Sequence, residues 1–167
     1  NRAKAQVANK CDLEISDIKK MTIWGNHSPT MYPDLDNAEI KGESASGWIN
    51  DQNWIESDFL RIVQQRGKAI IDARGASSAT SAANAAIDTV KATLSETPED
   101  DWFSAAVLSD GSYNVPEGLI FGFPLKVDAK GNVSIVQDLP ISDYAQEKID
   151  LTTKELLDER SDIQDLL

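Results

Sequence analysis

The only histidine of this chain lies in a short loop that follows an apolar run. His27 is part of Trp24-Gly25-Asn26-His27-Ser28-Pro29-Thr30, which comes directly after Met21-Thr22-Ile23. Imidazole is the side chain whose ordinary pKa lies nearest to neutral pH, so it suits proton transfer. A loop of Gly, Asn and Pro at the end of a strand combines a rigid base with access to a cleft. We therefore expect a proton-transfer role for His27, with a structural surface histidine as the alternative.

The length and charge of the chain are those of one globular domain. Its 167 residues are enough to bury a core, and we expect a single domain over residues 1–167. The net charge of −12, from 16 basic and 28 acidic residues, leaves no basic stripe for nucleic acid. No apolar run approaches the ~20 residues that span a membrane. We expect neither nucleic acid nor a membrane as a partner.

Cysteine and acidic residues offer two further site types, and the sequence favours neither. Cys11 is the only cysteine, which excludes a disulfide within the chain and fits a reducing compartment. It lies in a predicted helix without a nearby histidine, a poor setting for a nucleophile. Asp34, Asp36 and Glu39 form no Asp-x-Asp-x-Asp-Gly loop, so we interpret them as solvated loop charges and expect no metal site.

Apolar residues at three- and four-residue spacing predict four helices. These cover residues 2–11, a stretch with one apolar face from Phe59 to Ala73, residues 77 or 78 to about 94, and residues 142 to beyond 157. Gly75 is a natural end for the second helix. The third helix has an apolar face made mostly of alanine. Small residues allow close approach, so this face predicts tight packing within the domain, a dimer interface, or both.

Short apolar runs between the helices predict strands. They lie at residues 21–24, 38–40, 105–108, 119–123, 125–127 and 133–136. The last two runs flank a five-residue loop that contains Gly131, a clear hairpin signal. Pro29 and Pro33 predict an irregular segment after His27, and residues 42–47 read as a loop. Helices and antiparallel strands together predict an α+β fold.

Several spaced motifs occur in the same order as in a known enzyme family. They are Asn1-Arg2-Ala3-Lys4-Ala5-Gln6, Trp24-Gly25-Asn26-His27-Ser28, Gln64-Gln65-Arg66-Gly67, Ala73-Arg74-Gly75-Ala76-Ser77-Ser78-Ala79, Leu108-Ser109-Asp110-Gly111-Ser112-Tyr113 and Asp150-Leu151-Thr152. Over essentially the whole chain they resemble the C-terminal, substrate-binding domain of the cytosolic-type malate dehydrogenases in the lactate/malate dehydrogenase family. The resemblance implies a twisted antiparallel sheet packed against long helices.

The resemblance also implies roles for three residues. His27 is expected to accept and return a proton as malate and oxaloacetate interconvert with NAD as cofactor. Arg2 is expected to hold the substrate carboxylate, which a planar guanidinium binds through two hydrogen bonds. Ser77 is expected to line the pocket, with helix N-capping as its alternative. His27 and Arg2 should then face a common cavity, in a cytoplasmic homodimer.

The dinucleotide site is expected to lie outside this chain. No Gly-x-Gly-x-x-Gly opens a helix after a strand, so the Rossmann domain is absent and none of these residues is expected to bind the cofactor. The family pairs its histidine with an aspartate two residues before the position of Asn1. We therefore expect a C-terminal half that is inactive alone, with NAD bound by a missing N-terminal Rossmann domain and residues 1–11 displaced or swapped.

Three other accounts remain open from the residues. A lactate dehydrogenase of the same branch differs mainly in a loop of the missing half. A self-associating structural fragment would pair its freed helices with another copy. A hydrolase would use His27 and Ser77, although Gly75-Ala76-Ser77-Ser78-Ala79 is not a Gly-x-Ser-x-Gly elbow.

Overall fold

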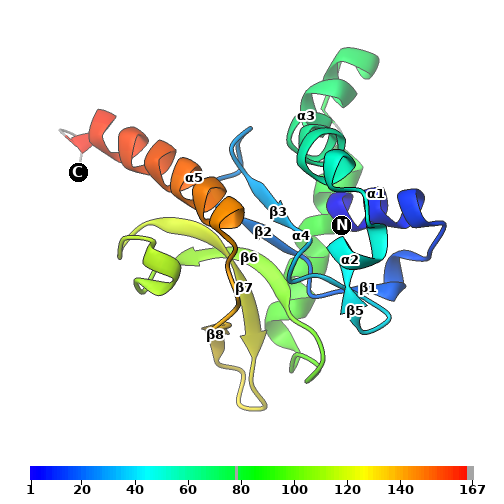
Figure 1. The fold of residues 1–167 in the computed structure, drawn as a ribbon. Helices are drawn as coiled ribbons and strands as arrows, with labels where there is room; N and C mark the ends of the chain where they lie inside the picture. Colours follow the sequence, from blue (N-terminus) through cyan, green and yellow to red (C-terminus); the bar gives the residue numbers. More distant parts are fainter. Residues whose placement is uncertain (78, 165–167) are drawn as a thin grey trace.

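The computed structural model describes residues 1–77 and 79–164, in which long helices surround small antiparallel sheets (Figure 1). The α-helices are α1 (Arg2–Cys11), α2 (Ala45–Ile49), α3 (Leu60–Arg74), α4 (Ala79–Leu94) and α5 (Asp143–Asp162). Shorter helical turns are η1 (Ile15–Asp17), η2 (Trp54–Phe59) and η3 (Ser112–Asn114). The four predicted helices are confirmed, except that Ser78, one predicted start of the third, lies outside the described residues.

The strands pair into three small sheets, and every pair is antiparallel within the described residues. One sheet has the order β1 (Ile18–Lys19), β4 (Glu39–Ile40), β5 (Glu43–Ser44). The second pairs β2 (Thr22–Trp24) with β3 (Tyr32–Asp34). The third has the order β6 (Phe103–Leu108), β7 (Ile120–Val127), β8 (Val133–Ile135). The predicted hairpin between β7 and β8 is confirmed.

One hydrophobic core lies between α1, the sheet β1-β4-β5 and the start of α3. Helix α1 buries Ala3, Val7 and Ala8, which share one face at helical spacing. Phe59, at the end of η2, and Val63, in the first turn of α3, are buried in the same core. The expectation that residues 1–11 are displaced is therefore wrong for this structure, because α1 packs on its own chain.

A second core lies between the sheet β6-β7-β8 and α5. Trp24, Phe121 and Phe123 are fully buried, and Ala145 and Ile149 of α5 pack on them. Helix α5 begins where the sequence predicts, because the Ser142 hydroxyl accepts a hydrogen bond from the Ala145 amide at 3.2 Å. The carboxyl-terminal half of α5 extends away from the sheets (Figure 1).

Proline misled two strand predictions. Pro33 lies inside β3, opposite Ile23, in a two-stranded sheet where a missing N–H costs little. Pro124 lies inside β7, so residues 119–123 and 125–127 form one strand and not two. The Pro124 carbonyl accepts a hydrogen bond from the Val136 amide, just beyond the end of β8. The nitrogen and carbonyl of a strand residue point to the same side, so the nitrogen of Pro124 also faces β8 and not β6. The pairing with β6 therefore loses no hydrogen bond.

A loop prediction over residues 42–47 is also wrong. This stretch contains β5 and the start of the short helix α2. The Ser44 hydroxyl caps the helix by accepting from the Gly47 amide at 3.5 Å, and Asn50 ends it in a left-handed conformation. Elements this short carry too few residues for a periodic apolar pattern.

Helix α4 buries none of its residues in this chain. Its Ile87, Val90 and Leu94 are 54, 55 and 80% exposed. The interpretation as tight packing within the domain is therefore wrong. The described helices include none that is both long and apolar enough to cross a membrane.

Candidate active site

The strand that leads to His27 crosses β7 at two glycines. The Gly25 and Gly122 amides donate to each other's carbonyls at 3.3 and 2.9 Å. A Cβ at Gly122 would lie 2.6 Å from the Ile23 carbonyl oxygen, so only glycine permits this approach. At Gly25 a Cβ would lie 2.2 Å from the Thr152 side chain, and φ is +94°. The crossing therefore fixes where the chain leaves β2 and enters the His27 loop.

The loop itself is anchored to α5 on both sides of His27. The Asn26 amide donates to Thr152 Oγ1 at 2.9 Å, and the Ser28 hydroxyl donates to Glu155 at 2.5 Å. The side chain of His27 is exposed. Within residues 1–77 and 79–164 its imidazole makes no hydrogen bond. The histidine is thus held through its neighbours, with the ring left open to a ligand.

Arg2 lies between α3 and α4. It is half-buried in the first turn of α1, and its Nη2 donates to the Ser81 hydroxyl at 3.4 Å. A Cβ built at Gly67 would lie 3.8 Å from Arg2 Nη1, so the guanidinium packs close to the backbone of α3.

Helix α3 connects the two sequence-predicted residues. Gln64 Nε2 donates to the Met31 carbonyl at 2.9 Å, which ties α3 to the turn that carries His27. Gly67, three residues further, lies on the same helix face and meets Arg2. Met31, at the end of the His27 loop, and Arg2 therefore contact one face of α3 at positions about one helical turn apart.

Ser77 lies at the break between α3 and α4 and is exposed. Its carbonyl accepts from the Ala79 amide at 3.1 Å at the start of α4, the helix that Arg2 contacts. Within the described part of the chain, no hydrogen bond joins Ser77 to His27. The pair that a hydrolase requires is therefore not formed.

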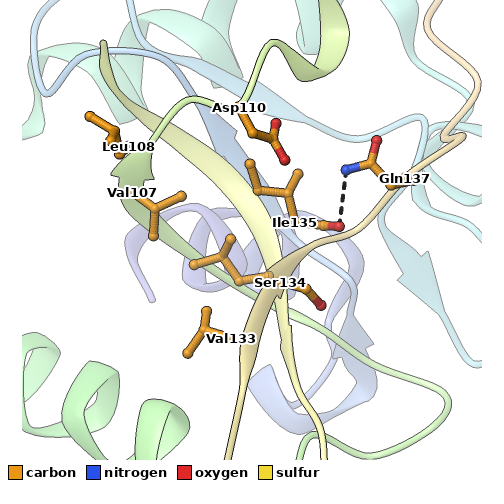
Figure 2. A pocket seen from close by; sticks show the side chains of 8 residues that line it. Val107, Leu108, Asp110, Val133, Ser134, Ile135 and Gln137 are labelled. Carbon is orange, nitrogen blue, oxygen red and sulfur yellow. Dashed lines mark hydrogen bonds between the residues drawn. The ribbon is translucent and has the colours of Figure 1, made fainter. Parts of the chain in front are cut away.

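Two surface hollows lie away from the expected common cavity of His27 and Arg2. The larger one, open and of about 540 Å³, lies on the sheet β6-β7-β8 (Figure 2). Its lining residues are Val107, Leu108, Asp110, Leu125, Val133, Ser134, Ile135 and Gln137. The other lies at the end of α5, beside Leu157 and Arg160. Neither of these two hollows is lined by His27 or Arg2.

Asp34 was wrongly interpreted as a solvated loop charge. It is fully buried in β3, where its carboxylate accepts from Trp24 Nε1 at 3.0 Å and from Asn37 Nδ2 at 2.9 Å. Burial raises the pKa of the Asp34 carboxyl above its ordinary value, against the opposing effect of these hydrogen bonds. The Asp34 carboxylate therefore binds Trp24, the last residue of β2 before the His27 loop. No group of metal-ligating side chains occurs among the described residues.

The crossing of Gly25 and Gly122 does not fit a dinucleotide. The one close approach of two glycine backbones, at Gly25 and Gly122, is filled by Thr152 and by the Ile23 carbonyl, which leaves no cradle for a pyrophosphate.

Comparison with known proteins identifies the family. The family model for the lactate/malate dehydrogenase alpha/beta C-terminal domain matches residues 1–166. The chain belongs to the lactate/malate dehydrogenase family. A malate dehydrogenase of Cutibacterium acnes is 52% identical over 166 residues, which are 99% of this chain and 50% of that protein.

Solved dehydrogenase structures share the fold. The malate dehydrogenase of Naegleria fowleri, 42% identical, superposes with a TM-score of 0.91 over 99% of this chain and 50% of its own. The lactate dehydrogenase of Trichomonas vaginalis, solved with NADH and oxamate, is 30% identical with a TM-score of 0.90 over 99% of this chain and 51% of its own. The chain thus spans about half the length of these relatives and has the fold of the C-terminal dehydrogenase domain.

Proposed function

We propose that residues 1–167 form the single substrate-binding domain of an NAD-dependent malate dehydrogenase, which interconverts malate and oxaloacetate. The observation that carries the proposal is the arrangement of the His27 loop and Arg2 along one face of α3. The 52% identity to a malate dehydrogenase favours malate over other 2-hydroxy acids.

His27 is the proposed proton acceptor. It takes the proton of the substrate hydroxyl during oxidation and returns it to the carbonyl oxygen during reduction. Its exposed ring, at the end of a loop tied to α5, suits a group that must meet a bound ligand.

Arg2 is the proposed anchor for a substrate carboxylate. A guanidinium forms two parallel hydrogen bonds with a carboxylate, which fixes the orientation of the carbon between them. Ser77, at the start of the helix that Arg2 contacts, lines the same site in this proposal.

NAD belongs to a separate N-terminal Rossmann domain in this proposal, where it supplies the hydride acceptor. That domain would also supply an aspartate partner for the His27 ring, which has none among residues 1–77 and 79–164. The chain alone is therefore expected to be inactive.

The exposed face of α4 supports a homodimer. Val90 and Leu94 leave apolar surface in water that a second copy would cover. Exchange of both residues for Glu is expected to lower self-association at least about tenfold, measured by sedimentation velocity. A wild-type chain that is monomeric with and without its N-terminal half would contradict the dimer. We place the enzyme in the cytoplasm, where a reduced Cys11 is expected.

The decisive experiment joins this chain to its dinucleotide-binding half and follows NADH formation with malate and with lactate. Faster turnover of malate, and none by the 167-residue chain alone, is the expected result. Faster turnover of lactate would favour the lactate dehydrogenase alternative, and no turnover of either would contradict the proposal. Arg2→Lys is expected to raise KM about 10-fold or more, because one point charge replaces a bidentate pair. The control is Arg61→Lys, because Arg61 of α3 pairs with Asp58 of η2 and both side chains are exposed.

A further inference from the structure

Both residues that flank His27 in the sequence are bound by one carboxylate on α5. Glu155 Oε2 accepts from the Ser28 hydroxyl at 2.5 Å and from Asn26 Nδ2 at 3.3 Å, and the same Nδ2 donates to Glu159 at 3.1 Å. The Thr30 hydroxyl donates to the same oxygen at 2.6 Å. Three donors from a five-residue segment therefore converge on one atom.

Thr152 holds the same segment one helical turn earlier. Its Oγ1 accepts from the Asn26 amide at 2.9 Å and lies 2.9 Å from Thr30 Oγ1. Thr152 is fully buried, and its side chain fills the space above Gly25. Thr152 and Glu155 share one face of α5, because they are three residues apart.

The helix that carries these two residues is itself well anchored. Ala145 and Ile149 fix α5 to the second core, and α5 runs beside β3 and the β2–β3 turn (Figure 1). The hydrogen bonds from α5 therefore fix the His27 loop relative to the second core. For a proton acceptor this matters, because a misplacement of ~1 Å costs about 100-fold in rate.

We propose that Glu155 is the positioning residue of His27, which orients the imidazole towards the substrate by holding Asn26, Ser28 and Thr30. This inference rests on the proposed role of His27 as proton acceptor. Glu155 itself contacts no reacting atom.

The charge of Glu155 is what makes it suitable. The hydroxyls of Ser28 and Thr30 lie 2.8 Å apart and could otherwise satisfy each other. All three donors meet Oε2, and a charged carboxylate oxygen accepts them more strongly than the carbonyl of a glutamine, whose NH₂ group would also need acceptors. Burial alone would raise the pKa of Glu155, but the hydrogen bonds from Ser28, Thr30 and Asn26 hold it below its ordinary value.

The single histidine gives a direct readout of this positioning. In the isotope-labelled 167-residue chain, the His27 backbone order parameter and its one set of imidazole signals are measured for wild type, Glu155→Gln and Glu155→Ala. The matched control is Asp158→Asn, which removes a carboxylate that pairs with Lys154 on the exposed side of α5. The expected result is an order parameter that falls from ~0.85 to below ~0.6 in Glu155→Ala, with the control unchanged.

Unchanged order at His27 in a folded Glu155→Ala chain would overturn the proposal. Should that variant fail to fold, Glu155→Gln and Thr30→Val carry the test, with the same shift in the His27 signals expected and unchanged signals overturning it.

Kinetics of the joined protein separate positioning from a merely structural role. Glu155→Ala is expected to lower kcat about 10- to 100-fold with KM within about 2-fold, and Asp158→Asn to change neither. An unchanged kcat would overturn the proposal. If His27→Gln left turnover intact while the His27 signals still depended on Glu155, the proposed function would fail and the structural link would stand.

Discussion

The second core, between the sheet β6-β7-β8 and α5, and helix α4 differ in how much of their apolar surface is buried. Around the His27 loop, Trp24, Phe121 and Phe123 are fully buried between the sheet β6-β7-β8 and α5. By contrast, α4 has no fully buried residue, and its contacts with α1 include the hydrogen bonds from Asn1 to Asp88 at 2.7 Å and from Arg2 to Ser81. The first region contains a hydrophobic core, whereas α4 leaves Ile87, Val90 and Leu94 exposed.

The same difference separates the residues of the candidate site, since the His27 loop is bound to α5 whereas Arg2 and Ser77 lie beside the exposed helix α4. His27 is positioned by the region that has its core complete. Arg2 and Ser77 lie beside α4, where the second region lacks a cover. Under the proposed function, we expect another domain or a second copy to cover this side of the site.

Truncation of one core residue should separate the two regions most clearly. Phe123→Ala is expected to lower the free energy of unfolding by about 3–5 kcal/mol, because it empties a fully buried position. Leu94→Ala on α4 is expected to change it by no more than about 0.5 kcal/mol. Urea unfolding of the 167-residue chain measures both. Equal losses would show that α4 contributes to the same core.

The backbone crossing of Gly25 and Gly122, which precedes the His27 loop, provides the next test. Gly122→Ala places a methyl group against the Ile23 carbonyl and is expected to cost about 3 kcal/mol. Gly118→Ala is the control, since its surroundings are open and only its positive φ is strained, at about 1 kcal/mol. Thermal unfolding compares the two. A Gly122 variant no less stable than the control would contradict the close approach of β2 and β7.

Asp34 tests the polar support of the packed region. Asp34→Ala leaves the buried Trp24 Nε1 and the Asn37 amide without their acceptor and is expected to cost about 2 kcal/mol. Asp36→Ala, two residues along and exposed, is expected to fall within about 0.5 kcal/mol of wild type. Denaturant melts followed by tryptophan fluorescence distinguish them. A loss in the Asp36 variant as large as that in Asp34→Ala would refute the assignment.

The smallest effect concerns pH. The pKa of Glu155 is lower in the folded chain than its ordinary 4.5, so its carboxylate stabilises the fold above pH 4.5. This contribution is lost as the pH falls through the lowered pKa. Wild type is therefore expected to exceed Glu155→Gln in stability near neutral pH, and the gap to close in acid. Unfolding curves over a pH series measure the gap, and a gap independent of pH would contradict the role of the charge.

Sequence patterns predicted the elements whose signals are local. Helix α1, the cap at Ser142 and the β7–β8 hairpin each follow from residues within one short window. The single strand through Pro124 could not be predicted, because it depends on where β8 ends. The burial of Asp34 could not be predicted either, because it depends on a hydrogen bond from Trp24 on the neighbouring strand. Only the spatial structure brings Glu155 to Ser28, since 127 residues separate them in the sequence.

The site residues stay predictions, because no ligand contact in this structure tests them. His27 and Arg2 stand out by residue type and by family resemblance, and α3 aligns them. The cavity expected between them requires surfaces that local patterns in this chain do not describe.

The proposed proton transfer is tested most directly by His27→Gln in the protein that joins this chain to its dinucleotide-binding half. Turnover of saturating malate is expected to fall about 10²- to 10⁴-fold, while the folded state and NADH binding remain as in wild type. Turnover within twofold of wild type would contradict the role of His27.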